Sequence, residues 1–450
     1  ERKVGSMIVT DQEGRPLGIF TDKDLRNQIA QGDFQPSRPG TSIKASPVIT
    51  IAPEMTVADV QILMVKHKIH HLCVTADGTI QTPVVGVVSN HDLLVIQANN
   101  PATLIREIQR AKDGLRLARI RDQAEILLKK YIYQEVNIMF ISTIMSEIND
   151  ALIARANQLA EMELQLQGIQ QPAVKFCWLG LGSEGRREQL LRTDQDNALI
   201  FENVPTEKEA AVKMYFLDYA KIVTRILNQA GFVYCPANMM ASNPQWCLPL
   251  DKWKANFSHW INAGTGEALM HSTIFFDYRP LYGTQTLAES LTVFIFEALK
   301  DKTIFFTRLA KNALENPPPL SFFRNFVVER GGVHKDKFDI KSRAMMPLVD
   351  AARVLILQHQ LSGIHNTVRR FQKLAEIEPQ NAHIYHQAAD AYEIFMRYRV
   401  LQGLRDLNSG RYFDPAELNK LERMNLRNSF KPIDEIQDLI EVRFQTSFLA

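Results

Sequence analysis

The sequence contains few cysteines, and their placement excludes two kinds of site. Four of the 450 residues are cysteine, and no two of them form a Cys-x-x-Cys pair; they are Cys73, Cys177, Cys235 and Cys247. Scattered cysteines in small number are typical of a reducing compartment, and they argue against a disulfide framework or a cysteine-based zinc site. We therefore expect a cytoplasmic protein.

A strong excess of one charge is also missing. Lysine and arginine together number 52, and aspartate and glutamate number 50, which leaves a net charge of +2. Such a balance gives no general case for binding nucleic acid or an anionic membrane surface. No stretch reaches the roughly 18 apolar residues of a membrane-spanning helix, and no signal-peptide pattern opens the chain. We expect neither nucleic acid nor a membrane as a partner.

The composition that is present is typical of a globular protein. Hydrophobic residues make up 46% of the chain and charged residues 23%, close to the average of soluble domains, which rules out a fibre or a wholly disordered chain. A chain of 450 residues suggests roughly three domains. Because the chain begins with Glu1 and not with methionine, we expect residue 1 to be a boundary within a longer natural protein.

A weak internal repeat lies near the N-terminus. Residues 18–25 read Gly-Ile-Phe-Thr-Asp-Lys-Asp-Leu, and residues 86–93 read Gly-Val-Val-Ser-Asn-His-Asp-Leu. In each copy a strand leads to a hydroxyl residue and then to an acidic residue that opens a helix. The second copy is whole and the first lacks its beginning. Between them the pattern predicts further elements, namely strands at 48–51, 71–75 and 84–88 and a helix at 57–68 that Thr56 caps.

The rest of the chain changes character twice. Residues 102–168 have the composition of one or two long helices, which we interpret as a spacer or a dimerisation bundle. An α/β segment follows, and after residue 286 nearly everything reads as helix. The α/β segment is predicted to contain strands at 174–179, 198–201 and 272–276 and a helix at 207–230.

These patterns predict an α+β multidomain fold with four parts. The repeat region would form a paired domain, followed by a helical connector, an α/β domain and a helical domain. The expected boundaries are 1–100, 101–170, 171–285 and 286–450 respectively.

A glycine-rich turn follows the first strand of the α/β segment. Residues 179–188 read Leu-Gly-Leu-Gly-Ser-Glu-Gly-Arg-Arg-Glu, so Gly182 and Ser183 open a short helix. Exposed amides at such a place bind phosphate, and glycine lets a phosphate approach the backbone. The sequence therefore predicts a phosphate site at Gly182 and Ser183.

Two aspartates, Asp194 and Asp196, follow shortly and run into a strand. Side-chain alternation along a strand places both carboxylates on one face. Two adjacent carboxylates repel each other unless a cation lies between them, and Mg²⁺ binds carboxylates together with triphosphate oxygens. A Walker P-loop is excluded, because no Gly-Lys-Ser/Thr is present. The alternative interpretation is a structural turn with two surface aspartates.

Gly-Ser followed by Asp-x-Asp resembles the signature of the DNA polymerase β-like nucleotidyltransferases. The longer string, with Gly-Arg at 185–186 and Thr-Asp-Gln-Asp-Asn at 193–197, is similar to one branch of them. That branch contains the PII-protein uridylyltransferases and the glutamine-synthetase adenylyltransferases. The resemblance implies an NTP substrate, a Mg²⁺ cofactor with Mn²⁺ as an alternative, and a third carboxylate on a later strand.

Asp277 is the expected third carboxylate. It stands in Phe-Phe-Asp-Tyr-Arg-Pro at 275–280, which resembles the Asp-x-Arg segment of the adenylyltransferases. Asp251 and Glu267 are competitors in the same region, and a structural aspartate–arginine pair is the alternative. The resemblance thus implies that the catalytic and metal-binding residues are Asp194, Asp196 and Asp277.

Three cationic residues are candidates for contacting the triphosphate. Arg186 and Arg187 lie beside the turn, and either guanidinium could hold a phosphate by its fork. The alternative is that these arginines pair with Glu184 or Glu188. Lys341 opens a helix of the C-terminal region and would face the triphosphate across a cleft. The tryptophans at 246, 253 and 260 recur every seven residues, so we interpret them as core before base binding.

The N-terminal repeat resembles the motifs of cystathionine-β-synthase (CBS) domains, which occur in pairs. The resemblance implies binding of an adenosine nucleotide, in which a hydroxyl residue and an aspartate of each copy address phosphate and ribose. Carried over residue by residue, these positions are Thr21, Asp24, Ser89 and Asp92. The alternative is a dimerisation module without a ligand.

The order of the parts resembles a family of bacterial signal-transduction nucleotidyltransferases. The resemblance implies transfer of a nucleoside monophosphate from an NTP to a protein or small-molecule acceptor, with regulation at the CBS pair. It also implies a homodimer formed through the CBS pair and the connector. The tail lacks the histidine-aspartate phosphohydrolase motif of the PII uridylyltransferases, which argues against close equivalence with them. The alternative is a catalytically inactive, nucleotide-sensing interaction protein.

Overall fold

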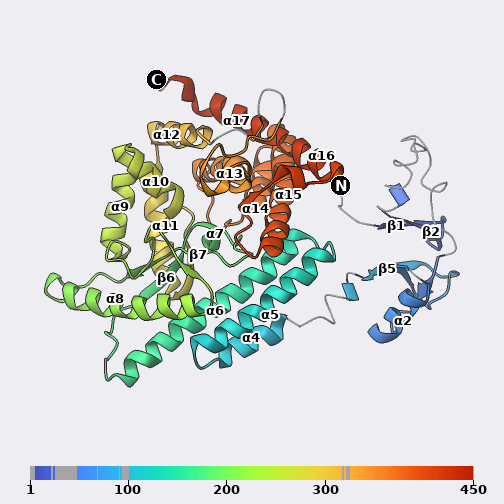
Figure 1. Ribbon diagram of the computed structural model, residues 1–450, viewed down its shortest axis with the longest axis horizontal. Helices are drawn as coiled ribbons and strands as arrows, with labels where there is room; N and C mark the ends of the chain where they lie inside the picture. Colours follow the sequence, from blue (N-terminus) through green and yellow to red (C-terminus); the bar gives the residue numbers. More distant parts are fainter. Residues whose placement is uncertain are drawn as a thin grey trace. The chain divides into compact units, whose positions relative to one another are not determined.

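The structure is a computed structural model in which the chain divides into two compact units, Glu1–Asn100 and Pro101–Ala450 (Figure 1). No helix in the described part of the chain is both long and apolar enough to cross a membrane. The expected mixture of helices and strands is confirmed. The described residues are 6–21, 24–25, 48–67, 69–90, 92–93, 101–316, 319–320 and 325–448.

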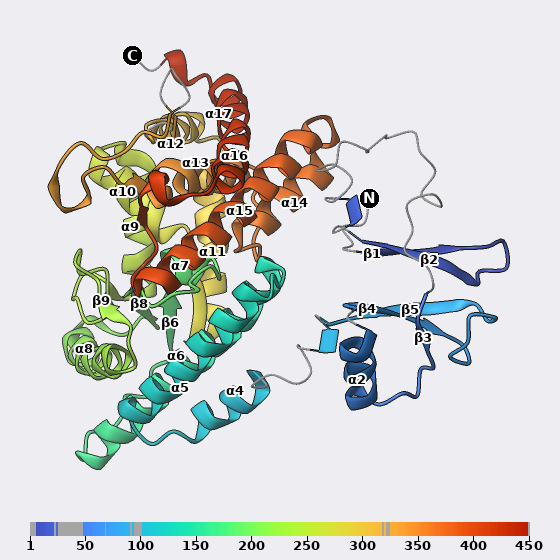
Figure 2. The same cartoon turned by 45° about the vertical axis from the view of Figure 1, so that its right-hand side comes forward.

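The N-terminal unit contains two small sheets and a helix (Figure 2). One sheet pairs β1 with β2 in antiparallel register, and the other has the order β3-β4-β5. The helix packs on the second sheet through a core that includes Val60, Met64 and Leu72. Thr56 accepts a hydrogen bond from Asp59 and so caps the helix as predicted. The elements are β1 (Ser6–Thr10), β2 (Pro16–Thr21), β3 (Thr50–Ile51), α2 (Val57–His67), β4 (His71–Thr75) and β5 (Val84–Ser89).

A four-stranded sheet is the centre of the larger unit. Its order is β10-β8-β6-β11; β6 runs antiparallel to both of its neighbours, and β8 runs parallel to β10. Both β6 and β8 are buried along their whole length, because helices cover them and their sequences are continuously apolar after the first residues. The strands are β6 (Phe176–Gly180), β8 (Asn197–Phe201), β10 (Cys247–Pro249) and β11 (Arg279–Gly283).

Three helices precede the sheet, and the last of them packs against it. The region that we expected to hold one or two long helices forms α4 (Pro101–Arg110), α5 (Gly114–Tyr133) and α6 (Ile138–Leu166). Asp113 and Asn137 cap α5 and α6 by accepting backbone N–H bonds, so the chain turns at these two residues. Helix α6 packs against β11 and against α8 (Thr206–Gln229), which brings the connector to the edge of the α/β region.

One predicted strand is wrong. Residues 272–276 do not form a strand: residues 272–275 end helix α10 (Gly266–Phe275), which Thr265 caps, and Phe276 is its C-cap. Phe275 packs on Trp246 and Trp260, so the apolar run is buried as part of a helix in an aromatic cluster. A short apolar run of this kind has no periodicity that separates a buried strand from a buried helix segment.

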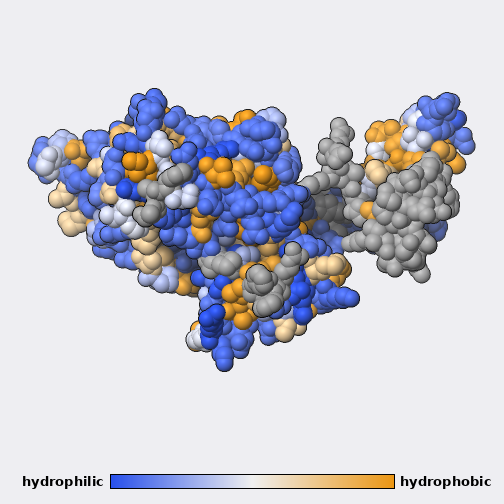
Figure 3. Space-filling view, turned by 90° about the horizontal axis from the view of Figure 1, so that it is seen from above, coloured by the Kyte–Doolittle hydropathy of each residue, from blue (hydrophilic) through white to orange (hydrophobic). Residues whose placement is uncertain are grey.

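The C-terminal region is helical, as predicted. In the described part of this region, the helices are interrupted by two short strands that pair with each other, β12 (Phe338–Asp339) and β13 (Tyr412–Phe413). The face of the larger unit in Figure 3 is mostly hydrophilic, with scattered apolar residues. The helices that complete the larger unit are α9 (Leu250–Ala263), α11 (Gln285–Leu299), α12 (Thr303–Leu314), α13 (Met346–Gln358), α14 (Thr367–Ile377), α15 (Ala382–Asp406), α16 (Lys420–Asn428) and α17 (Lys431–Phe444).

Candidate active site

The glycine-rich turn leaves β6 and forms the short helix α7 (Gly182–Gly185). Gly182 has φ +54°, a left-handed conformation that favours glycine, and a Cβ there would lie 3.4 Å from an Asp196 carboxylate oxygen. Gly185 is constrained more strongly, because a Cβ would lie 1.7 Å from the backbone oxygen of Asp277. The two glycines therefore let the turn approach both the Asp-x-Asp segment and the chain at residue 277.

The two aspartates lie together, as the alternation predicts. Ligand atoms of Asp194, Asp196 and Cys235 all lie within 4.8 Å of one another, which makes a group that could hold a metal ion. Gln195 and Asn197 turn to the other side: Gln195 donates to the backbone oxygens of Thr224 and Phe232, and Asn197 accepts from the Ala241 amide. These buried hydrogen bonds of Gln195 and Asn197, which alternate with the aspartates along the chain, hold both carboxylates on the opposite face.

The electrostatics of this group fit a divalent cation. Burial raises the pKa of Asp196 to about 6, with the adjacent charge of Asp194 as the next cause. Burial likewise raises the pKa of the Cys235 thiol to about 11. A cation between the three side chains would remove the repulsion between the carboxylates and favour their ionised forms. Cys235 could not be predicted as a member of this group from the sequence, because no metal-ligand spacing links it to the aspartates.

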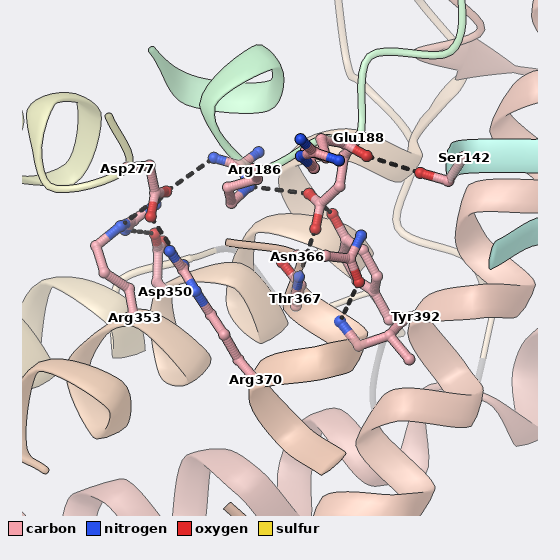
Figure 4. A network of polar contacts seen from close by, with 12 residues as sticks. Ser142, Arg186, Glu188, Asp277, Asp350, Arg353, Asn366, Thr367, Arg370 and Tyr392 are labelled. Carbon is pink, nitrogen blue, oxygen red and sulfur yellow. Dashed lines mark hydrogen bonds and ion pairs between the residues drawn. The ribbon is translucent and has the colours of Figure 1, made fainter. Parts of the chain in front are cut away.

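Asp277 lies elsewhere, between α10 and β11, and the expectation that it joins the two aspartates does not match the geometry. It is absent from the group of metal-ligating side chains found among the described residues. Its carboxylate is 1% exposed and forms ion pairs with Arg353 (2.7 Å), Arg186 (2.9 Å) and Arg370 (2.8 Å), as Figure 4 shows. Burial alone would raise the pKa of Asp277, but the charges of these arginines hold it well below its usual range.

The competing carboxylates do not take the third position either. Asp251 is exposed in the first turn of α9, and Glu267 lies in the first turn of α10. Neither belongs to the group of metal-ligating residues in the described part of the chain. The alternative for Asp277, a structural pair with an arginine, fits its ion pairs, although the partners are Arg186, Arg353 and Arg370 and not the nearby Arg279, which pairs with Asp150 and Glu184.

Arg186 and Arg187 are both engaged in ion pairs. Arg186 is buried and bridges Glu188 (2.9 Å) and Asp277, so its guanidinium is committed to the protein interior. Arg187 pairs with Glu147 and Asp150 on α6. Both arginines thus pair with carboxylates of the protein itself. For Arg186 one of these partners is Glu188, as the alternative interpretation of the sequence proposed.

Glu188 fastens the end of the turn to the C-terminal helices (Figure 4). One of its oxygens accepts a hydrogen bond from the Thr367 amide at the start of α14 (2.6 Å). The other accepts hydrogen bonds from the Tyr392 hydroxyl of α15 (2.7 Å) and from Arg186. Because all of these groups are buried, losing one partner would leave the others unsatisfied. The turn is therefore held rigidly on this side.

Helix α6 holds the turn on its other side. Ser142 donates to the backbone oxygen of Arg187 (2.7 Å), and Asn149 donates to that of Gln189 (2.9 Å). Asp150 receives two bonds of 2.7 Å from Arg279, the arginine of the Asp-x-Arg segment. The connector expected to be a spacer thus contacts the candidate site directly.

A small cavity lies between the turn and the C-terminal helices. From the turn it is lined by Ser183 and Thr193, and from the C-terminal helices by Met345, Met396 and Arg399. Lys341 begins the π-helical turn Lys341–Met345, and electrostatic interactions couple it to Asp194 and Asp196. Lys341 is thus near the aspartates, as expected, whereas Arg399 carries no motif that the sequence could reveal.

The two CBS-like motifs have the same local geometry. The Thr21 hydroxyl and amide both donate to an Asp24 oxygen (2.7 and 2.9 Å), and the Ser89 hydroxyl and amide donate in the same way to Asp92 (2.7 and 2.7 Å). The repeat seen in the sequence is therefore a repeat of structure. Lys23, an additional candidate in the first motif, lies outside the described residues.

Comparison with protein families matches three models along the chain. Residues 1–31 and 41–99 match "CBS domain", residues 122–267 match "Putative nucleotidyltransferase DUF294", and residues 303–444 match "Putative nucleotidyltransferase substrate binding domain". The chain is a CBS-containing protein of the DUF294 family. The resemblance drawn from the Gly-Ser and Asp-x-Asp motifs is thereby confirmed at the level of the family.

Individual relatives of this DUF294 protein cover only parts of it. An uncharacterized protein of Methanopyrus kandleri is 28% identical over 116 residues, which are 26% of this chain and 58% of that protein. This DUF294 chain therefore spans little more than half the length of that relative. A solved structure of a signal-transduction protein with CBS domains from Burkholderia ambifaria is 23% identical, with 22% of this chain and 69% of that chain covered and a TM-score of 0.19.

Proposed function

We propose that the protein transfers a nucleoside monophosphate from an NTP to a protein or small-molecule acceptor. A nucleophilic atom of the acceptor forms a bond to the α-phosphorus, and the bond from that phosphorus to the bridging oxygen breaks. Pyrophosphate leaves with the electron pair of the broken bond. The observation that carries the proposal is the group of Asp194, Asp196 and Cys235 beside the turn that bears Ser183.

Asp194 and Asp196 are the residues that would hold a divalent cation, with the Cys235 thiol next to them. A bound Mg²⁺ or Mn²⁺ supplies charge stabilisation for the phosphate oxygens and their alignment. Gly182 and Ser183 lie against this group and would contact the phosphates. Asp277 has no place in this set, because its oxygens are bound by arginines.

The labelled-nucleotide experiment tests the proposal. The protein is incubated with each labelled NTP and Mg²⁺ or Mn²⁺, in the presence of cell extract as the source of acceptor, and pyrophosphate and labelled product are measured. Asp194→Asn should lower transfer roughly a hundredfold or more, because the metal loses a charged ligand. Unchanged transfer in a folded Asp194→Asn protein would place the site elsewhere.

One observation favours a second candidate, a nucleotide-sensing protein without transferase activity. Asp277, the residue that resembles the third catalytic carboxylate, is engaged in a buried ion-pair network with three arginines. The same experiment separates the two candidates. Tight NTP binding without pyrophosphate release, with every NTP and both metals, would favour the sensor.

Regulation by an adenosine nucleotide at the CBS pair is part of the proposal. It is supported by the matching geometry of Thr21 with Asp24 and of Ser89 with Asp92. The contacts of α6 with the turn supply a physical connection between the connector and the site. A nucleotide can regulate only if it binds two states with different affinity, so transfer should change when AMP, ADP or ATP is added, and Asp92→Ala should abolish the change. A homodimer through the CBS pair and connector remains a prediction.

A further inference from the structure

Two cations of the C-terminal region face the aspartate pair without an anionic partner of their own. Lys341 begins the π-helical turn before α13, and Arg399 lies on α15. Among the described residues, no carboxylate lies within ion-pair distance of either side chain. Arg399 donates only to the backbone oxygen of Ser409 (3.1 Å). By contrast, the neighbouring buried arginines at positions 186, 353 and 370 are all paired with Asp277.

Among the described residues, the positive charges of Lys341 and Arg399 have no counterion, although both side chains are partly removed from water. Both side chains are half-buried, and burial lowers the pKa of each. The next cause of the lowered pKa of Lys341 is the charge of Arg399, so the two cations are close enough to repel each other. Cations removed from water without a partner destabilise a fold unless an anion joins them.

The position of the pair indicates which anion. Arg399 lines the same cavity as Ser183 and Thr193, so it faces the glycine-rich turn. Lys341 interacts electrostatically with Asp194 and Asp196, and Arg399 with Asp194. A ligand that extended from this cavity to the aspartates would meet carboxylates able to hold a metal at one end and cations at the other. A polyphosphate with a bound divalent ion has this distribution of charge.

The local chain fixes the backbone of Lys341 in place. The Ile340 amide donates to the backbone oxygen of Arg411 (3.0 Å), and the Ser342 amide donates to an Asp339 oxygen (3.0 Å), so Lys341 is anchored on both sides. Arg411 in turn pairs with Asp339 (2.7 Å). This neighbouring arginine therefore has its own counterion, which leaves the charge of Lys341 and Arg399 for a ligand.

We propose that Lys341 and Arg399 bind the β- and γ-phosphates of the NTP and so make the C-terminal region half of the nucleotide site. This inference rests on the proposed function and deepens it. The guanidinium of Arg399 can hold two phosphate oxygens by its fork, and the Lys341 ammonium acts as a point charge. The two residues would stabilise the negative charge that develops on the departing pyrophosphate.

Equilibrium binding of three probes to the full chain tests the inference. The probes are an NTP, the corresponding NMP and inorganic tripolyphosphate, with Ca²⁺ in place of Mg²⁺ to suppress turnover. Arg399→Gln and Lys341→Gln should weaken binding of the NTP and of tripolyphosphate roughly ten- to a hundredfold, since each loses a charge-assisted contact. Binding of the NMP should change less than about threefold. Arg399→Lys should restore part of the affinity.

Arg405→Gln is the matched control, because Arg405 lies exposed on the same helix and pairs with Glu417. It should leave binding of all three probes unchanged. The inference is overturned if Arg399→Gln binds tripolyphosphate as tightly as the wild type, if it loses NMP and NTP equally, or if the wild type binds no polyphosphate. Tripolyphosphate binding that depends on Arg399, in a protein that shows no transfer with any acceptor, would leave the inference standing while the proposed transferase activity fails.

Discussion

At the scale of single residues, Asp196 shows a conflict between stability and function. Its carboxylate is half-buried beside Asp194, and burial together with that charge raises its pKa to about 6. Without a cation, the folded protein holds two repelling carboxylates that the unfolded chain separates. A bound cation, as the proposed function requires, would remove this repulsion.

Asp196→Asn should stabilise the metal-free protein while abolishing transfer. A raised pKa in the folded state contributes stability that is present at low pH and is lost as pH rises through about 6. Removing the charge should raise the free energy of unfolding at pH 7 by about 1 to 2 kcal/mol. Urea unfolding at pH 5 and pH 7 with EDTA measures this, and the gain should shrink at pH 5. A variant less stable than the wild type at pH 7 would contradict the account.

Cys235 should affect which metals bind. Thiolate is a soft ligand, so Cd²⁺ should bind more tightly than Mg²⁺ and displace the thiol proton. Cys235→Ser should weaken Cd²⁺ binding about tenfold or more and abolish the ultraviolet band of a cadmium–thiolate bond, with Mg²⁺ binding nearly unchanged. Cys247→Ser, at a buried cysteine outside the group, is the control and should keep the band. A band that survives in Cys235→Ser would show that the thiol is not a ligand.

At the scale of secondary-structure elements, helix α6 positions the site. Its buried Asn149 donates to the backbone oxygen of Gln189 and to Glu184 (3.3 Å), while Ser142 secures the Arg187 carbonyl. Burial, with the charge of Asp150 next, raises the pKa of Glu184 to about 7. The turn thus rests on polar contacts with the connector, and a movement of α6 would be felt at Ser183.

Asn149→Ala should raise the KM for NTP several-fold, because the turn loses a buried hydrogen bond, with a stability loss of about 1 to 3 kcal/mol. Asn157→Ala is a matched control on the same helix: Asn157 is buried and bonds Ile153 and Tyr219 but does not touch the turn. It should cost comparable stability in urea unfolding and leave KM unchanged. Equal changes of KM in both variants would show that the effect comes from a general loss of stability and not from the contact of Asn149 with the turn.

The sequence predicted helices better than it predicted this site. Long segments such as α8 carry helical periodicity over many turns, so the expected 207–230 agrees closely with the observed Thr206–Gln229. The Gly-Ser turn and the Asp-x-Asp pair were found because each is a local pattern. The run at 272–276 was misread because tertiary packing, which the sequence does not display, decides between a short strand and a short helix. Cys235 and Arg399 carry no local pattern at all, since folding alone brings them to the site.

At the scale of the whole larger unit, Asp277 joins regions far apart in the chain. It lies after α10 and receives Arg186 from the turn, Arg353 from α13 and Arg370 from α14. The resemblance to a catalytic motif could not reveal these surroundings, because the three arginines converge only in the folded chain. An anion shared by three buried cations is costly to remove.

Asp277→Asn should lower the free energy of unfolding at pH 7 by about 3 to 5 kcal/mol, because three guanidiniums lose their common counterion. Since the pKa of Asp277 is depressed in the folded state, its contribution is present above the unfolded pKa of about 4 and is lost progressively as pH falls from there to the folded pKa, so the loss has only begun at pH 3.5. Urea midpoints at pH 7 and pH 3.5 measure the difference, with exposed Glu417→Gln as the control. A stable variant that has lost metal binding would instead identify Asp277 as a ligand.

The bonds from Glu188 to Thr367 and Tyr392 set a limit on how this protein can be dissected. A shortened chain that stopped after α11 would remove these hydrogen-bond partners from the glycine-rich turn and expose the buried Glu188 carboxylate next to Arg186. Attempts to express an isolated α/β fragment should therefore yield insoluble material, whereas a truncation from the other end that begins near Pro101 retains every one of these bonds.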